Sequence, residues 1–202
     1  RSRGAEIGLR TSTFRGLRST VSAWMLDLDS ELLFVGDGGT TEPAAGSRRH
    51  GVTFSNFYRP VTELAIDADL SLARARFVDV PAGEASIPGA LERVVAGGIA
   101  WTPAQRGLFG ALRVRSFGAY PLVEDNSVRA RPSTLVNADV GLQLHTGTRL
   151  RLSILNVLDA RADDIQYFYR SRLPGEPPTG FDDVHFHPAE PRQLRASIEW
   201  RF

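Results

Sequence analysis

The sequence contains no cysteine and no apolar run of the roughly 18 residues that a membrane helix needs. The absence of cysteine excludes a disulfide scaffold, a zinc site with thiolate ligands and a cysteine nucleophile. The chain has almost no net charge, because 24 basic residues are balanced by 23 acidic ones, and this balance disfavours a general nucleic-acid-binding protein. The 42% content of hydrophobic residues is that of an ordinary folded protein and argues against disorder.

Apolar residues recur at every second position through most of the chain. In the last ten residues, for example, Leu194, Ile198 and Trp200 alternate with Arg195 and Glu199. This period of two is typical of a β-strand with two different faces. Nine strands are predicted, at 5–10, 18–35, 50–59, 64–71, 91–102, 108–118, 136–144, 149–154 and 193–202. In 18–35 both alternating sets are apolar, so the sequence does not assign their faces.

The connections between these strands alternate in length. Short connections are predicted near 15–16, 59–62, 103–107 and 146–147, and long ones near 36–49, 79–90, 119–132 and 159–190. This arrangement suits an up-and-down antiparallel sheet whose two ends face different environments. Outer-membrane barrels combine short periplasmic turns with long extracellular loops in this way.

The two faces of the predicted strands also differ. The polar face carries bulky charges such as Arg149 and Glu199, which a wide aqueous lumen accommodates. The apolar face ends in Trp200 and Phe202, and Trp101 lies near a short turn, where an aromatic girdle of a membrane barrel would lie. The pattern favours a membrane barrel, and a soluble β-sandwich with a solvated charged face is the alternative.

Four segments resemble motifs of TonB-dependent outer-membrane receptors, in the order in which that family carries them. Residues 2–7 resemble the opening of a mid-barrel strand, and 155–159 (Leu-Asn-Val-Leu-Asp) resemble the Asn-Leu-Phe-Asp segment of the penultimate strand. Residues 188–192 resemble the Pro-Arg lead-in to the last strand. The strand 195–202, with Trp200 and the terminal Phe202, resembles the signal read by the barrel assembly machinery.

The resemblance implies an all-β fold, an antiparallel up-and-down transmembrane β-barrel segment in the cell outer membrane. Residues 1–202 would be the C-terminal part of the barrel, incomplete without an N-terminal plug and the remaining strands, because nine is an odd number and a closed bacterial barrel has an even one. The expected partners are the plug and remaining strands, outer-membrane lipid, the TonB system and the barrel assembly machinery.

The function implied by the resemblance is uptake of a scarce solute, such as a ferric chelate, energised through TonB. Neither catalytic residues nor a cofactor are expected, and no enzyme activity is predicted. Two alternatives remain open: a small self-contained outer-membrane barrel, porin-like or enzymatic, and a soluble β-sandwich binding module.

An aromatic and basic stretch is the best candidate for ligand contact. Tyr167, Phe168 and Tyr169 are followed by Arg170 and Arg172. Aromatic rings and guanidinium groups supply stacking and charge for an anionic ligand or a metal chelate. The alternative is that this stretch packs a long loop against the barrel rim.

Two histidines downstream form the second candidate. His185 and His187 are two residues apart and follow Asp182 and Asp183, so both imidazoles could lie on one face of a strand. They are expected to contact ligand from a loop on the outside. A dedicated metal site is not predicted, because no cysteine or further histidine lies nearby in the sequence, and packing or water binding is the alternative.

Overall fold

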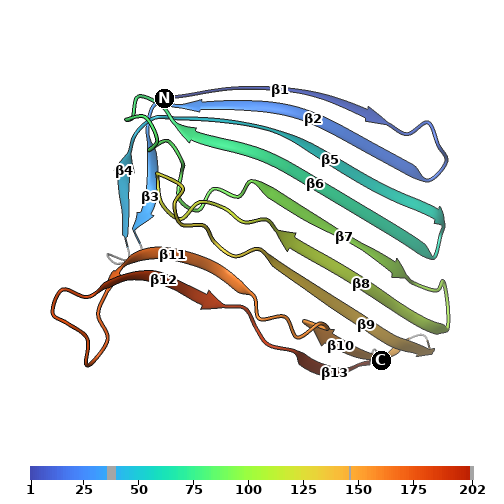
Figure 1. Cartoon of the computed structure of the whole chain (residues 1–202). Helices are drawn as coiled ribbons and strands as arrows, with labels where there is room; N and C mark the ends of the chain where they lie inside the picture. Colours follow the sequence, from blue (N-terminus) through green and yellow to red (C-terminus); the bar gives the residue numbers. More distant parts are fainter. Residues whose placement is uncertain (36–39, 146, 201–202) are drawn as a thin grey trace.

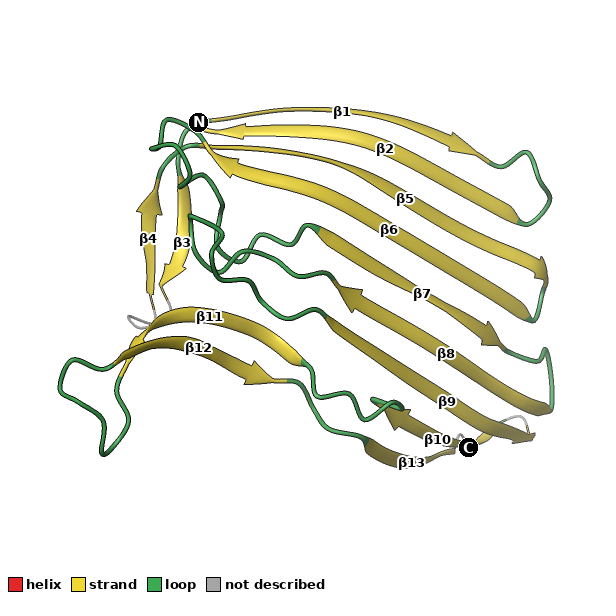
Figure 2. Ribbon diagram, viewed as in Figure 1, coloured by secondary structure: helices red, strands yellow, loops and turns green. Residues whose placement is uncertain are grey.

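The computed structural model describes residues 1–35, 40–145 and 147–200. Its main element is one antiparallel sheet of nine strands (Figure 1 and Figure 2). In spatial order these are β1 (Ser2–Thr11), β2 (Leu17–Leu28), β5 (Ser47–Val61), β6 (Leu64–Phe77), β7 (Arg93–Trp101), β8 (Gly107–Phe117), β9 (Ser133–His145), β10 (Thr148–Leu155) and β13 (Gln193–Trp200). The predicted antiparallel sheet of nine strands is confirmed.

The two ends of the sheet differ as predicted. Short turns join β1 to β2, β5 to β6, β7 to β8 and β9 to β10, and they gather at one end of the sheet (Figure 1). The long connections gather at the other end, which we call the long-loop end. The described part of the chain contains no helix with the length and hydrophobicity needed to cross a membrane.

The predicted strand at 18–35 is wrong in its second half. β2 ends at Leu28, and β3 (Glu31–Val35) leaves the sheet to form a separate hairpin with β4 (Thr40–Ala44). Asp29 and Ser30 separate the two strands and are polar and exposed, which favours a bend over a continuous strand. The apolar run of β3 therefore belongs to a long-loop hairpin.

A second hairpin lies in the connection 159–190, which was expected to be a loop. It consists of β11 (Asp163–Ser171) and β12 (Phe181–Pro188). Because β10 pairs directly with β13, this hairpin is an insertion in the connection between two neighbouring strands of the sheet.

The pairing register assigns the faces that the sequence left open in β2. Val21 lies opposite Leu9 on one side and Phe54 on the other, so it belongs to the apolar face. Trp24 points to the polar face, where it lies over Gly51: a Cβ atom at residue 51 would lie 2.7 Å from Cζ2 of Trp24. Glycine at that position thus makes room for the indole ring.

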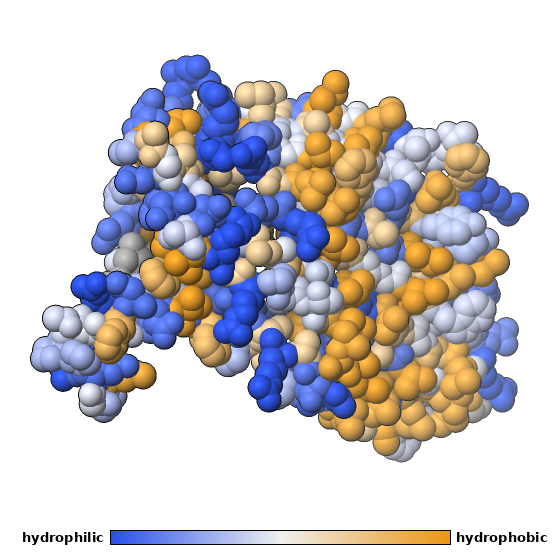
Figure 3. Space-filling model, viewed as in Figure 1, coloured by the Kyte–Doolittle hydropathy of each residue, from blue (hydrophilic) through white to orange (hydrophobic). Residues whose placement is uncertain are grey.

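Large apolar side chains remain exposed on the apolar face. The exposed fraction is 44% for Ile99, 48% for Leu112 and 48% for Val140, all near the middle of the sheet. Figure 3 shows hydrophobic residues spread over the strands. A β-sandwich would cover this face with a second large sheet, but the other sheets of the described residues are the two hairpins. The sandwich alternative is therefore wrong.

The polar face is held together by charged and hydroxyl side chains. Arg113 donates to Asp67 at 2.6 Å, and the Ser153 hydroxyl donates to Asp139 at 2.5 Å. Near the short turns the Arg149 guanidinium stacks on the Phe109 ring, 4.6 Å from its centroid. These contacts confirm the predicted charged face.

Candidate ligand-binding site

The hairpin β11–β12 is fixed to the loop 119–132 by a buried glutamine. The side-chain amide of Gln166 donates to the carbonyl of Arg131 and accepts a bond from its N–H, both at 3.2 Å. The backbone N–H of Gln166 donates to the hydroxyl of Tyr120 at 3.3 Å. Only 4% of Gln166 is exposed, so these bonds are shielded from water and hold the hairpin firmly.

A small apolar core lies under the same hairpin. Phe168 and Val184 pack against a buried cluster of Tyr120, Leu122 and Ala130. Burial raises the pKa of the Tyr120 phenol above its ordinary value, although the bond from the Gln166 N–H acts in the opposite direction. The phenol is therefore neutral at physiological pH and serves as a hydrogen-bonding group of the core.

A cavity of about 430 Å³ opens between this hairpin, β3 and the loops of the long-loop end. Tyr167 and Tyr169 line it from β11, and Phe34 lines it from β3, with its ring centroid 5.2 Å from that of Tyr167. Phe117, on the polar face of β8, forms another part of the wall. The cavity is thus an aromatic pocket on the polar side of the sheet.

The charged groups of the cavity wall are acidic. Glu124, Asp163 and Asp164 line the pocket, and no arginine of the described residues does so. Arg115, which lies on the same face of β8 as Phe117, donates to Asp164 at 3.2 Å. The pocket offers aromatic faces and carboxylate oxygens, a combination that suits neutral groups and cations.

The two predicted arginines lie outside this cavity. Arg170 forms a bidentate ion pair with Asp182 across the hairpin, with hydrogen bonds of 3.1 and 2.8 Å. The hydrogen bond from Arg170 lowers the pKa of the Asp182 carboxyl. Arg172 donates to the carbonyl of Glu176 at 3.2 Å in the turn of the hairpin. Both side chains are exposed to solvent.

The two predicted histidines lie on one face of β12, as expected from their spacing. The ring of His185 stacks on Tyr169, with centroids 3.9 Å apart and planes tilted by 14°. Its Nε2 atom is shielded and has no hydrogen-bond partner among the described residues. His187 is exposed. Within the described residues, no group of three side chains is arranged to hold a metal ion.

The hairpin β3–β4 is anchored by a buried carboxylate. Glu31, 9% exposed, accepts hydrogen bonds from the Arg49 guanidinium, one of them at 2.8 Å, and from the Ser47 hydroxyl. Burial alone would raise the pKa of Glu31, but the bonds from Arg49 and Ser47 outweigh it and lower the pKa below its ordinary value. The anchor brings Phe34 to the cavity.

Acidification is therefore expected to release the hairpin β3–β4. A lowered pKa in the folded state means that Glu31 stabilises the anchored form at neutral pH and that this contribution is lost as the pH falls below about 4. The protection factors of the backbone amides in 31–35 and 40–44, taken relative to the intrinsic exchange rate at each pH, should fall at low pH. Glu31→Gln should lower them already at neutral pH, whereas Glu42→Gln, a change at an exposed carboxyl of β4, should not. Equal exchange in both variants would contradict the role of Glu31.

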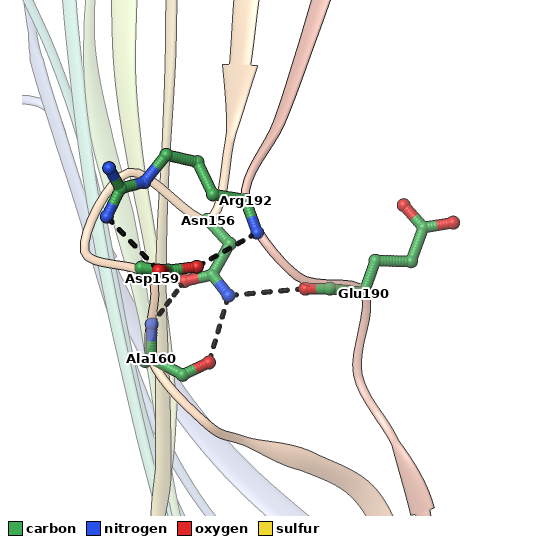
Figure 4. A network of polar contacts seen from close by, with 5 residues as sticks. All are labelled: Asn156, Asp159, Ala160, Glu190 and Arg192. Carbon is green, nitrogen blue, oxygen red and sulfur yellow. Dashed lines mark hydrogen bonds and ion pairs between the residues drawn. The ribbon is translucent and has the colours of Figure 1, made fainter.

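The base of the hairpin β11–β12 is closed by a polar network (Figure 4). The side chain of Asn156 donates to the carbonyls of Ala160 at 2.9 Å and Glu190 at 3.2 Å, and accepts from the Ala160 N–H at 2.9 Å. Asp159 accepts from the backbone N–H of Arg192 at 3.3 Å. The two motifs 155–159 and 188–192 therefore meet in space, and the network sets where the hairpin leaves the sheet.

Sequence reasoning located Tyr167 and Tyr169 but missed several residues around them. Phe34, Phe117 and Tyr120 come from three other segments, and no local pattern links those segments to β11. Gln166 carried a weak signal, because a polar residue between Ile165 and Tyr167 needs partners when it is buried. Of the predicted assembly signal 195–202, the structure describes residues 195–200, and Trp200 ends β13 at the short-turn end; Phe202 lies outside the described residues.

No protein-family model and no curated protein matches the sequence. Solved structures do match. The ferric yersiniabactin uptake receptor FyuA from Yersinia pestis is 17% identical, with a TM-score of 0.78 over 100% of this chain and 30% of that one. The ferric preacinetobactin receptor BauA from Acinetobacter baumannii is 15% identical, with a TM-score of 0.67 over 98% and 29%.

The copper transporter OprC gives 12% identity and a TM-score of 0.68 over 100% of this chain and 31% of that one. The chain thus spans about a third of the length of the structures it matches. Its fold is that of a C-terminal barrel portion of TonB-dependent receptors, which confirms the fold that the sequence motifs implied.

Proposed function

We propose that this chain is the C-terminal part of the barrel of a TonB-dependent outer-membrane receptor. The observation that carries the proposal is the structural match of the whole chain to part of a ferric yersiniabactin uptake receptor, at a TM-score of 0.78. The complete receptor binds a scarce solute, such as a ferric chelate, on the outside and imports it with energy delivered through TonB. The chain itself performs no covalent chemistry.

The exposed apolar face supports a location in the outer membrane. Side chains such as Ile99, Leu112 and Val140 would contact lipid, and the polar face with Asp67 and Arg113 would line the aqueous interior. Trp101 and Trp200, both exposed and both close to the short turns, would lie at the periplasmic interface.

The open edges of the sheet support further partners. β1 pairs only with β2 and β13 only with β10 in the described sheet, and free edges are costly in lipid. In the proposed receptor, the remaining barrel strands cover these edges, and an N-terminal plug fills the interior. Trp200 and Phe202 would carry the signal for the barrel assembly machinery.

The aromatic cavity is the proposed point of ligand contact in this part of the receptor. Tyr167 and Tyr169 would contact the solute directly, and His185 would support the Tyr169 ring by stacking on it. Arg170, Arg172 and His187 would meet an arriving solute at the exposed surface of the hairpin.

Replacing both tyrosines should therefore weaken binding. In the complete receptor, Tyr167→Ala/Tyr169→Ala should reduce affinity for the imported chelate at least about tenfold, because each stacked ring contributes on the order of 1 kcal/mol. Binding of a panel of ferric chelates to cells grown with limiting iron measures it. Phe181→Ala, a change at an exposed aromatic residue of β12 that is not among the residues lining the cavity, is the control. Unchanged binding in the double variant would remove the cavity from the proposal, and no uptake of any metal chelate by the wild type would refute the transport function.

A further inference from the structure

Five arginines gather on the apolar face, at the long-loop end of the strands. We call them the basic patch, and they are Arg3, Arg48, Arg74, Arg76 and Arg93. All five are exposed. The whole chain has a net charge of only +1, so this local concentration is not a consequence of a basic composition.

The pairing register places three of them in one row across four strands. Arg3 lies opposite Asp27, Asp27 opposite Arg48, and Arg48 opposite Arg76. Because the register is continuous, neighbouring positions of the row are about 5 Å apart at the Cα atoms. The row contains three guanidinium groups and one carboxylate.

The second row lies two residues closer to the middle of the sheet. In it Arg74 lies opposite His50, on the same face as Arg48 and Arg76. Arg93 lies opposite Leu72, one row further in. Cationic side chains therefore follow the rim of the apolar face from β1 to β7.

The charges of this patch are not balanced within the described chain. Arg48 donates to Asp27 at 2.8 Å, which neutralises one arginine. No carboxylate of the described residues pairs with Arg74 or Arg76, and Arg76 lies directly opposite Arg48. Like charges in directly opposite positions destabilise a sheet, so the arrangement favours a bound anion between the guanidinium groups.

The height of the patch on the sheet matches the level of lipid headgroups. On β6 the apolar face runs from Leu64 to Leu72 before Arg74 begins. At about 3.3 Å per residue this is roughly 26 Å along the strand, or roughly 20 Å of membrane depth at a tilt of about 40°, close to the apolar band of such barrels. Arg74 and Arg76 lie just beyond that band.

We propose that the basic patch binds the phosphate groups of a phosphorylated glycolipid in the external leaflet of the outer membrane. The proposal rests on the membrane location proposed above. Guanidinium groups bind phosphate through paired, charge-assisted hydrogen bonds. Leu72 and Phe54, 42% and 41% exposed on the same face, supply the surface on which the acyl chains of the same molecule lie. This continuity of charge and apolar surface favours a lipid over a free anion.

The test uses the complete receptor in uncharged dodecyl maltoside micelles, titrated with diphosphoryl lipid A and followed by native mass spectrometry. Arg74→Gln/Arg76→Gln should weaken binding at least about tenfold. Arg74→Lys/Arg76→Lys should bind with an intermediate affinity, because the charge is kept but the paired hydrogen bonds of the guanidinium groups are lost. Arg15→Gln/Arg106→Gln removes the same charge from exposed positions at the short-turn end and should bind like the wild type.

Each of the other outcomes would overturn a specific part of the proposal. Equal binding by wild type and Arg74→Gln/Arg76→Gln, or equal loss in the control at the short-turn end, would overturn the proposal for this patch. Competition by phosphatidylglycerol or inorganic phosphate as strong as by lipid A itself would overturn the choice of a glycolipid. Failure of the wild type to fold in micelles would instead refute the membrane location, and the proposed function with it.

Discussion

Leu112→Arg is expected to destabilise the receptor folded in a bilayer by about 2–4 kcal/mol. Leu112 lies at the centre of β8, the sixth of the nine strands in the sheet, and 48% of it is exposed on the apolar face. A guanidinium at that position would lie in hydrocarbon without a partner. Urea unfolding of the complete receptor from phosphatidylcholine vesicles measures the change.

Ala111→Arg is the matched control, because it places the same side chain one residue away on the opposite face. Residue 111 lies opposite Asp139 in the neighbouring strand, so the new guanidinium would have a carboxylate within reach. We expect a change below about 1 kcal/mol at this position. Equal effects of the two substitutions would show that the two faces meet the same environment and would exclude the membrane location.

Asn156→Ala is expected to destabilise the base of the hairpin β11–β12 by about 3 kcal/mol. The substitution removes three hydrogen bonds from a residue that is 3% exposed and leaves buried backbone groups without partners. It also places alanine at a φ of 49°, in the left-handed region that alanine disfavours. Hydrogen exchange across 159–190 should rise sharply.

Two further variants separate these causes. Asn156→Gly accepts the positive φ and should recover about 1 kcal/mol, which leaves the loss of the side-chain bonds. Asn126→Ala changes an exposed asparagine with a φ of 61° and one bond from Arg129, and should cost about 1 kcal/mol or less. A cost for Asn126→Ala as large as that for Asn156→Ala would contradict the role of the buried network.

The nine-stranded sheet could be predicted because each of its strands separates two different environments. In β9, Val136, Val140 and Leu142 alternate with Asn137 and Asp139, and the structure turns the two sets to opposite faces. The up-and-down order of the strands followed from the same period together with the connection lengths. Side-chain periodicity alone therefore predicts the strands whose two faces meet different environments.

The hairpins of the long-loop end could not be predicted in the same way. β11 does not alternate between apolar and polar residues in the order Ile165, Gln166, Tyr167, Phe168. Gln166 is polar but buried, because its hydrogen-bond partners come from another loop. The prediction joined β3 to β2 because both are apolar. The polar Asp29 and Ser30 bend the chain between them, and the buried Glu31 anchors β3 outside the sheet.

The candidate site was predicted only in part, because the hairpin that carries it was not predicted. Tyr167 and Tyr169 stood out by composition alone. That Arg170 pairs with Asp182, and that His185 stacks on Tyr169, depends on the cross-strand register of β11 and β12. The basic patch depends on register as well, since Arg3, Arg48 and Arg76 are far apart in the sequence.

The odd number of strands has a consequence for self-association. β1 and β13 run in the same direction, because eight reversals separate them. If a second copy joined by rotation about the barrel axis, β13 of one copy would meet β1 of the other in parallel, against the antiparallel pattern of every other strand pair. If the second copy were inverted, the seams would be antiparallel, but its long polar loops would project from the opposite side of the membrane. Two copies of this sheet therefore cannot complete each other as one oriented antiparallel pore.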